Sequence, residues 1–239
     1  MVEARTLLHR DDGLATTATV GETIADLELL VIARFLRQIG TVLDIGCGRG
    51  RSSVYLNLQG FDMVGVEIDL PTLTQAKQLN RENNASCEFV RADGRNLCFR
   101  EARFDYAVSF GSTLSEKYRL WMGKEDRREV ISEAVRVTKS GGVIIVNFVH
   151  RYWSFRHLLS FMKNYVNWAR EKLRGVRTEL GDYTEVIGNT PIRFHAFTIR
   201  EAQQLFRKKG IKLSVWRRHS GLFSDWFFVV ARKTAGRLE

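Results

Sequence analysis

Short apolar runs and amphipathic stretches alternate along the first 150 residues of the chain. Runs of about four to eight apolar residues, bounded by glycine or polar positions, are typical of strands buried on both faces. Five such runs lie at residues 41–45, 61–68, 87–91, 104–110 and 143–149. Apolar spacings of three and four indicate helices at residues 22–38, 51–59, 71–82 and 125–138. This alternation predicts a doubly wound α/β fold, with a mostly parallel sheet covered by helices on both faces.

The pattern changes toward the C-terminus. A helix is predicted at residues 198–209, with Thr198 as its N-cap, and two further strands at residues 211–216 and 226–231. Because no helix separates these two strands, they must pair in an antiparallel or nearly antiparallel way. At the other end, residues 1–20 are polar and rich in threonine, and they predict a mobile or lid-forming arm.

Composition limits the class of protein. The chain has 239 residues, 44% of them hydrophobic, which is enough for one substantial core, so we expect one domain over residues 1–239. No apolar run reaches the roughly 18–20 residues of a membrane-spanning helix, and acidic residues stand where a signal peptide needs apolar ones. Cys47, Cys87 and Cys98 form no CxxC pair, which argues against a disulfide framework or a metal site. We therefore expect a cytoplasmic protein without a metal.

The net charge of +10 is unevenly distributed. Residues 1–150 carry 19 Lys and Arg against 20 Asp and Glu, whereas residues 151–239 carry 18 against 7. A partner with negative charge, such as RNA or a membrane surface, would explain this asymmetry. Solvated helix faces would explain it equally well.

Residues 42–50, VLDIGCGRG, join the first predicted strand to the next helix. The glycines give G-x-G-x-G, whereas dinucleotide-binding folds use G-x-G-x-x-G. Asp44 lies at the carboxyl end of the strand, where its charge would repel a pyrophosphate and attract a cation. S-adenosylmethionine (SAM) carries an ammonium and a sulfonium group and no phosphate, so this loop favours SAM over NAD(P). The alternative interpretation of Asp44 is a helix cap or a surface turn residue.

A second acidic residue ends the second predicted strand. Glu67 lies about 20 residues beyond the first glycine of the loop, where a carboxylate can accept hydrogen bonds from both ribose hydroxyls. We expect Ile68 to pack on an adenine ring and Asp69 to cap the helix at residues 71–82. Any nucleotide cofactor would use Glu67 in this way, so the residue predicts a ribose without choosing the cofactor.

Five segments resemble, in order, the motifs of the class I SAM-dependent methyltransferases. They read VLDIGCGRG, GVEID, FVRADGRNL, FDYAVSFGSTL and EAVRVTKSGGVIIV. The match extends over residues 40–150, with spacing typical of that family. The resemblance implies SAM as the cofactor and a seven-stranded sheet whose last two strands form the antiparallel hairpin.

The resemblance also implies roles for single residues. Asp44 would lie against the methionine moiety, and Glu67 would bind the ribose. Asp93 would receive the adenine amino group, with a capped turn as the alternative. Ser109 and Phe110 would line the site of methyl transfer. The complete set of predicted cofactor-binding residues is Asp44, Gly46, Cys47, Gly48, Gly50, Glu67, Ile68, Asp93, Gly94, Ser109 and Phe110.

Methyl transfer from a sulfonium requires positioning more than a general base. The candidates for a base are Glu116, Tyr118, His150 and His195, and the sequence chooses none of them. The family's Asn/Asp-Pro-Pro-Tyr/Phe motif for nucleobase nitrogens is missing, and no Pro-Cys occurs, so nucleobase amino groups and cytosine C5 are poor candidates. We expect a small or medium-sized metabolite as the acceptor. RNA (tRNA), a lipid or a quinone are the alternatives, and a SAM-binding partner subunit without activity is the non-enzymatic one.

Residues 151–197 follow the fifth predicted strand, and we expect them to form a cap within the domain. Their first part, residues 151–177, predicts an amphipathic helix with seven Lys and Arg and one acid. Three interpretations stay open for it: a cap whose apolar face packs on the domain, a basic aromatic surface for RNA, or a membrane-surface helix that serves a lipid or quinone acceptor. Residues 179–197 are mostly polar and predict a loop that closes the pocket.

Overall fold

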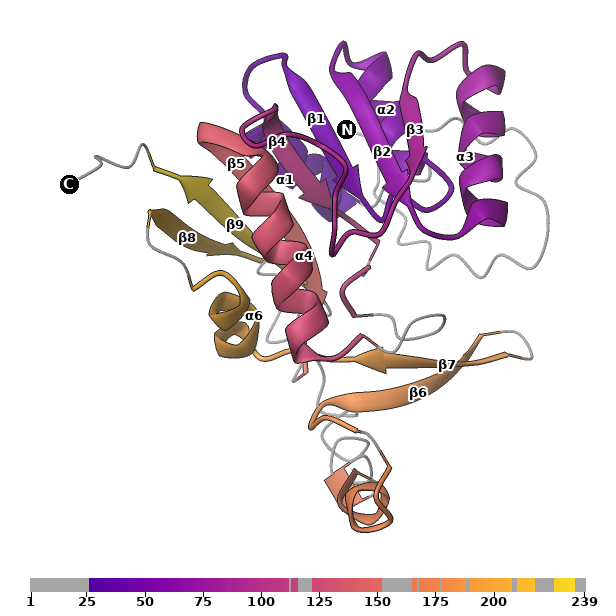
Figure 1. Cartoon of the computed structure of the whole chain (residues 1–239), viewed down its shortest axis with the longest axis vertical. Helices are drawn as coiled ribbons and strands as arrows, with labels where there is room; N and C mark the ends of the chain where they lie inside the picture. The colour runs from indigo at the N-terminus through magenta and orange to yellow at the C-terminus, as the bar shows by residue number, and fades with distance from the viewer. Residues whose placement is uncertain are drawn as a thin grey trace, which may run out of the picture.

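Figure 1 shows the protein as a computed structural model. The structure describes residues 26–111, 113–115, 122–151, 165–166, 168–176, 178–187, 190–207, 210–217 and 226–234. The arm predicted over residues 1–20 lies outside these ranges.

A seven-stranded sheet forms the centre of the protein, in the order β3-β2-β1-β4-β5-β9-β8 (Figure 1). Its strands are β1 (Thr41–Ile45), β2 (Asp62–Glu67), β3 (Glu88–Arg91), β4 (Phe104–Ser109), β5 (Thr138–Val149), β8 (Ile211–Trp216) and β9 (Trp226–Lys233). Strands β1 to β5 pair in parallel, and β9 is antiparallel to both β5 and β8. The predicted α/β fold with its antiparallel hairpin is confirmed. The strand order reverses between β1 and β4, the point where open α/β sheets bind ligands at the carboxyl ends of their strands.

Helices cover both faces of this sheet. They are α1 (Asp26–Phe35), α2 (Arg51–Leu58), α3 (Leu70–Glu82), α4 (Lys124–Val137) and α6 (Ile199–Leu205). Val31 of α1 packs in one apolar core and Ile131 of α4 in the other, while the neighbouring β1 residues Val42 and Leu43 enter one core each. Each such side chain contributes roughly 1.5–3 kcal/mol on burial. Burial on both faces is why these strands are almost continuously apolar in the sequence. Among the helices that the structure describes, none combines the length and the hydropathy needed to span a membrane.

Capping residues determine where two helices begin. Asp69 precedes α3 and accepts a hydrogen bond from the backbone N of Thr72 at 2.9 Å, with Pro71 in the first turn. At α6, the backbone N of Thr198 donates to Glu201 Oε2 at 2.7 Å, and the N of Glu201 donates to Thr198 Oγ1 at 3.2 Å. Both predicted caps are confirmed.

β5 begins earlier than the sequence predicts. The apolar run starts at residue 143, but the strand extends back to Thr138, which pairs with Phe104 of β4. The register then shifts between Phe104 and Tyr106. Thr138 also ends α4, because its hydroxyl donates to the carbonyl of Ala134 at 2.7 Å. The chain therefore passes from helix to strand without a loop.

A two-stranded sheet occupies the stretch for which the sequence predicts a closing loop. β6 (Asp182–Ile187) and β7 (Thr190–His195) pair antiparallel, and Tyr183 and Phe194 stack across the pair with ring centroids 5.6 Å apart. The loop prediction over residues 179–197 was wrong, because a hairpin of two strands needs apolar residues at only some positions. Figure 1 shows this hairpin below the central sheet.

The helix predicted over residues 151–177 is present over residues 165–173, wherever this span is described. The sequence predicts that its apolar face packs on the domain, yet Leu173 is 89% exposed. At this position the prediction is wrong. A polar side of the helix faces the protein instead, because Glu171 forms an ion pair of 2.7 Å with Arg193 of β7.

Candidate cofactor site

The chain turns between β1 and α2 at three glycines with positive φ. Gly46, Gly48 and Gly50 have φ values of 70°, 56° and 81°, a region that residues with side chains rarely adopt. A Cβ at Gly46 would overlap the side chain of Thr113, whereas a Cβ at Gly48 would have no atom within 4 Å. The backbone at Gly48 therefore borders open space, and a ligand can approach it closely.

Asp44, near the end of β1, is completely buried. Its Oδ2 accepts hydrogen bonds from the hydroxyls of Ser52 at 2.7 Å and Ser53 at 2.8 Å, and its Oδ1 has no hydrogen-bond partner among the described residues. Burial raises the pKa of Asp44, and the two serine hydroxyls oppose this shift. Asp44 is neither a surface turn residue nor a helix cap, since Gly50 holds the N-cap position of α2. An unpaired buried carboxylate oxygen is unfavourable unless a further group pairs with it.

Glu67 connects the ends of β1 and β2. Its Oε2 accepts a hydrogen bond from the backbone N of Gly48 at 3.1 Å. Its Oε1 accepts from the backbone N of Ile68 at 2.9 Å and of Asp69 at 3.0 Å. These bonds fix the Glu67 carboxylate beside Gly48, where the open space begins.

Asp93 is already paired with a cation. Arg95 donates to both carboxylate oxygens of Asp93, at 2.6 to 3.1 Å, and also to Asp126 of α4 at 2.9 Å. The hydrogen bonds from Arg95 lower the pKa of Asp93. Next to it, Gly94 permits close packing, because a Cβ there would lie 3.1 Å from Cγ2 of Ile45. Sequence reasoning did not identify Arg95 as the partner of the predicted adenine acceptor.

Three other predicted site residues have buried side chains. The hydroxyl of Ser109 donates to the carbonyl of Ile45 at 2.9 Å, and the ring of Phe110 packs edge-on against Phe228 with centroids 6.2 Å apart. Cys47 is buried, and burial raises the pKa of its thiol. These contacts position the ends of β1 and β4, and a direct contact with a ligand stays a prediction for all three.

A buried ion pair supports the glycine turn. Glu28 of α1 has a side chain that is 2% exposed, and it binds the guanidinium of Arg51 in a bidentate way, at 2.6 and 3.1 Å. Arg51 directly follows Gly50, so the pair connects α1 to the first turn of α2. The signal for Glu28 was present in the sequence, because an acid between Leu27 and Val31 interrupts the apolar face of the predicted helix.

The structure assigns no general base. Of the four candidates, Glu116 and Tyr118 lie outside the described residues. His150 packs its ring against Phe227, with centroids 5.5 Å apart. His195 is buried at the end of β7.

His195 belongs to a charged network at the base of the β6–β7 hairpin. Its Nδ1 lies 2.7 Å from Asp182 Oδ1 and 3.6 Å from Glu179 Oε2, and the three side chains bring their ligand atoms within 4.8 Å of one another. However, Arg127 lies 2.7 Å from Glu179, and Arg193 lies 3.6 Å from Asp182. Two guanidinium groups therefore already neutralise the two carboxylates, which favours an ion-pair network over a metal site.

The same network attaches the hairpin to the loop after β4. The backbone N of His195 donates to the carbonyl of Ser115 at 2.7 Å, and Nε of the buried Arg127 donates to the carbonyl of Leu114 at 3.0 Å. The Arg127 ring contact, with its guanidinium carbon 5.1 Å from the centroid of Phe197, completes the burial of this arginine.

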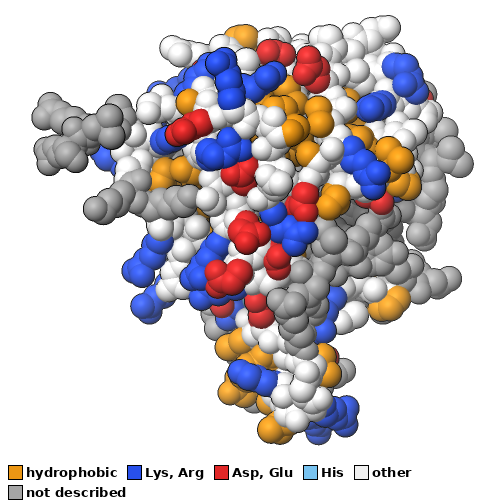
Figure 2. Space-filling model, viewed as in Figure 1, with side chains coloured by type: hydrophobic (Ala, Val, Ile, Leu, Met, Phe, Trp, Pro, Cys, Tyr) orange, Lys and Arg blue, Asp and Glu red, His pale blue; other side chains and the backbone are white. Residues whose placement is uncertain are grey.

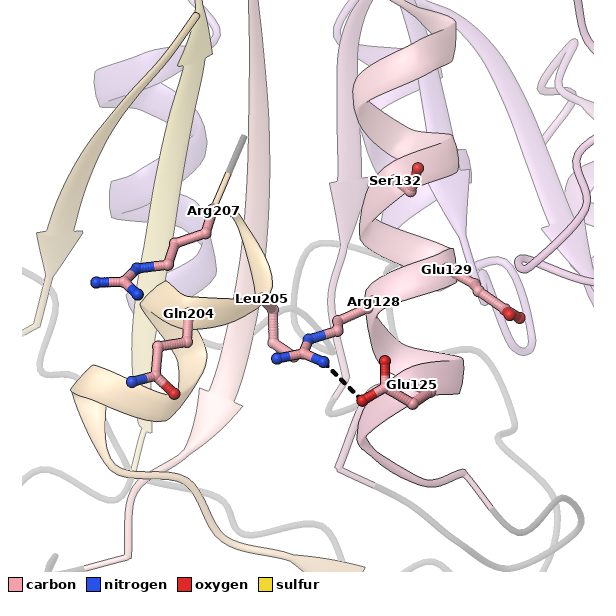
Figure 3. A pocket seen from close by; sticks show the side chains of 7 residues that line it. All are labelled: Glu125, Arg128, Glu129, Ser132, Gln204, Leu205 and Arg207. Carbon is pink, nitrogen blue, oxygen red and sulfur yellow. Dashed lines mark hydrogen bonds and ion pairs between the residues drawn. The ribbon is translucent and has the colours of Figure 1, made fainter. Parts of the chain in front are cut away.

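A shallow groove of about 500 Å³ lies between α4 and α6 (Figure 3). Its walls are mostly polar, and Arg128 and Glu125 form an ion pair of 2.6 Å at its edge. The lining residues are Glu125, Arg128, Glu129, Ser132, Gln204, Leu205 and Arg207. None of the predicted cofactor residues lines this groove.

The fold and the turn after β1 define the class of protein: a Rossmann-like α/β protein with a glycine turn and acidic residues at the ends of β1 and β2. The sequence profile of a family described as "Methyltransferase domain" matches residues 42–142. An uncharacterized methyltransferase of Synechocystis is 30% identical over 159 residues, which are 65% of this chain and 69% of the relative. The chain belongs to the class I SAM-dependent methyltransferases, and SAM is the cofactor of that family.

Two further similarities bear on the extent of the match. Malonyl-[acyl-carrier protein] O-methyltransferase of Salmonella typhimurium is 35% identical over 108 residues, 45% of this chain, and the chain spans only 38% of that relative. A crystal structure of a SAM-dependent methyltransferase from Methanosarcina mazei is 23% identical and superimposes with a TM-score of 0.68, over 86% of this chain and 98% of that one. The second similarity concerns the fold alone.

Proposed function

We propose that the chain binds SAM at the turn after β1 and transfers its methyl group to a small or medium-sized metabolite. The observation that carries this proposal is Asp44, a completely buried carboxylate with one oxygen that receives no hydrogen bond from the described residues. The methionine part of SAM carries an ammonium group, and an ammonium group would offset the unfavourable burial of this charge.

The residues at this turn fit the cofactor. Asp44 would face the ammonium group, and Glu67 would accept the ribose hydroxyls beside the open backbone of Gly48. Asp93 would receive the adenine amino group in competition with Arg95, which now binds both of its oxygens. Removal of Arg95 should therefore change adenine recognition.

SAM, when bound, supplies an electrophilic methyl group on a sulfonium sulfur. The chain must hold the acceptor in line with that group and exclude water from it. The sulfonium is a good leaving group, so these two tasks suffice for an acceptor that is already nucleophilic. The proposal therefore includes no general base.

The names of relatives support the size of the acceptor. Besides the malonyl-[acyl-carrier protein] O-methyltransferase, they include a demethylmenaquinone methyltransferase and a sarcosine/dimethylglycine N-methyltransferase. These names cover different acceptors, so they support the class of small or medium-sized metabolites and no single compound. RNA and lipid acceptors are the alternatives, and a SAM-binding subunit without activity is the non-enzymatic one.

The test is transfer of radiolabelled methyl from SAM into a cell extract that is then separated into small-molecule, lipid, RNA and protein fractions. We expect label in the small-molecule fraction with the natural chain and no label with Asp44→Asn. Label in RNA would contradict the proposed acceptor. Binding of SAM in a calorimeter without label in any fraction would favour the non-catalytic subunit, and no binding of SAM would contradict the site itself.

A further inference from the structure

The segment made of residues 165–166 and 168–176 exposes an unusual number of apolar side chains. Four of the eight large apolar residues that are exposed in the described part of the chain lie in it. Leu173 is 89% exposed, and Tyr165, Val166 and Val176 are 45% to 49% exposed. Exposed apolar residues that gather in one place mark an interaction surface, whereas isolated ones do not.

These side chains share one side of the segment. Residues one, four and eight positions apart project in similar directions from a helix, which places Tyr165, Val166 and Leu173 on a common face. Figure 2 shows apolar and basic side chains side by side at the lower end of the molecule, where Figure 1 has this segment. We call the segment the basic apolar ridge.

The charges of the ridge are sorted by sign. Arg170, Lys172 and Arg174 are exposed beside the apolar face. The acid of the described ridge, Glu171, points to the hairpin and is neutralised by Arg193 at 2.7 Å. The outward side is therefore positive as well as apolar, and it is complementary to a surface that is negative outside and apolar beneath.

Aromatic residues complete the ridge. Trp168 is half-buried, its ring centroid lies 5.4 Å from that of Tyr165, and Lys172 places its Nζ 5.2 Å from the Trp168 centroid. Trp, Tyr and Lys are the residues that favour the boundary between lipid headgroups and acyl chains, because each combines an apolar body with a polar tip.

We propose that the basic apolar ridge docks on the surface of an anionic lipid membrane. Leu173, Val166 and Val176 would enter the headgroup boundary, and the three exposed bases would contact lipid phosphates. RNA is the weaker fit, because the most exposed apolar residue, Leu173, is aliphatic and offers a base no ring to stack on. A second copy of the chain is the weaker fit as well, because a symmetric contact would bring like positive charges together.

This inference does not depend on the proposed function, so it is tested without SAM. The full chain is sedimented with vesicles of phosphatidylcholine alone and with vesicles that also contain phosphatidylglycerol. We expect sedimentation with the anionic vesicles and little with the neutral ones. The variant Arg170→Gln/Lys172→Gln/Arg174→Gln should lose on the order of 100-fold in partition, since each basic residue near an anionic surface contributes roughly fivefold.

Two further variants separate the ridge from the general charge of the protein. Leu173→Ser/Val176→Ser keeps all charges and should lose roughly tenfold, because it removes apolar surface from the contact. Lys77→Gln/Arg81→Gln/Arg100→Gln removes the same charge from exposed positions elsewhere and should leave partition nearly unchanged. Circular dichroism checks that each variant is folded.

Several results would overturn the proposal. These are no sedimentation with anionic vesicles, or equal losses in the ridge and control triple variants. Binding to an RNA homopolymer that needs the three bases but not Leu173 and Val176 would assign the ridge to RNA instead. A dimer in light scattering that Leu173→Ser/Val176→Ser abolishes would assign it to a second copy.

Discussion

The substitution Asp44→Asn separates a role in cofactor binding from a role in folding. In the free protein, the Asn carbonyl can accept the hydrogen bonds that Ser52 and Ser53 give to Oδ2, at 2.7 and 2.8 Å. The substitution also removes a buried charge, whose cost is the reason that burial raises the pKa of Asp44. We therefore expect the free energy of unfolding without SAM to fall by no more than about 1 kcal/mol, or to rise.

The effect on SAM binding should be large and opposite in meaning. A hydrogen bond to a charged group is worth about 1.5–3 kcal/mol, and the Asn amide would present a donor to an ammonium that is itself a donor. At the upper value the dissociation constant rises by roughly 100-fold. S-adenosylhomocysteine carries the same ammonium group, so its binding should weaken in parallel.

Calorimetry measures both ligands, and thermal unfolding with and without ligand measures the fold. Saturation at about 100 times the dissociation constant stabilises the natural protein by about 2.7 kcal/mol, and this gain should be nearly absent in Asp44→Asn. Asp69→Ala is the control: it removes the cap of α3, should cost about 1 kcal/mol of stability, and should leave SAM affinity unchanged. An Asp44→Asn protein that is folded and binds SAM as tightly as the natural chain would refute the reasoning.

Three further predictions follow from the same contacts. SAM affinity should decrease as the pH falls through the raised pKa of Asp44, because the ammonium binds the ionised form; stability without SAM should change in the opposite sense, since the folded state takes up this proton more readily than the unfolded state, and neither dependence should persist in Asp44→Asn when calorimetry and melting are repeated across pH. Gly48→Ala and Gly141→Ala should each cost about 1–2 kcal/mol in thermal melts, because both positions have positive φ and open space, but only Gly48→Ala should weaken SAM binding; equal affinities would place the ligand elsewhere. Glu179→Gln should cost about 2 kcal/mol in denaturant unfolding because the buried Arg127 loses its carboxylate, whereas Glu125→Gln, which breaks the exposed pair with Arg128, should cost less than about 0.5 kcal/mol; similar costs would show that the network does not stabilise the fold.

The strands of the central sheet could be predicted wherever burial left a clear period. β1 is covered on both faces, so its apolar run ends where the strand ends, and Thr41–Ile45 has the predicted bounds. β8 (Ile211–Trp216) also has the predicted bounds, because exposed and less exposed residues alternate along this edge strand. β5 was predicted too short, because its first residues, around Gly141 and Gly142, are polar or small and pair through their backbone.

The site could be predicted only in part. Asp44 and Glu67 follow from the sequence because each ends a strand, and the parallel pairing of β1 and β2 brings them to one edge of the sheet. Their charged neighbours do not follow, because those come from distant positions. Arg51 lies 23 residues from Glu28, and Arg95 lies 31 residues from Asp126. Motif spacing determines where the backbone passes, whereas the pairing of charges depends on how the helices pack.

The β6–β7 hairpin shows why polar residues misled the prediction. Glu179, Asp182 and His195 are typical of an exposed loop, yet Asp182 and His195 are buried. Their burial is tolerable because Arg127 and Arg193 supply opposite charges, so ion pairs and not an apolar core hold the hairpin to the domain. The same arrangement joins the ridge to the hairpin through Glu171 and Arg193, and the hairpin to the loop after β4 through the backbone of His195. Substitutions of these charges should therefore move the ridge and that loop together, whereas substitutions on the exposed apolar face of the ridge should leave the loop in place.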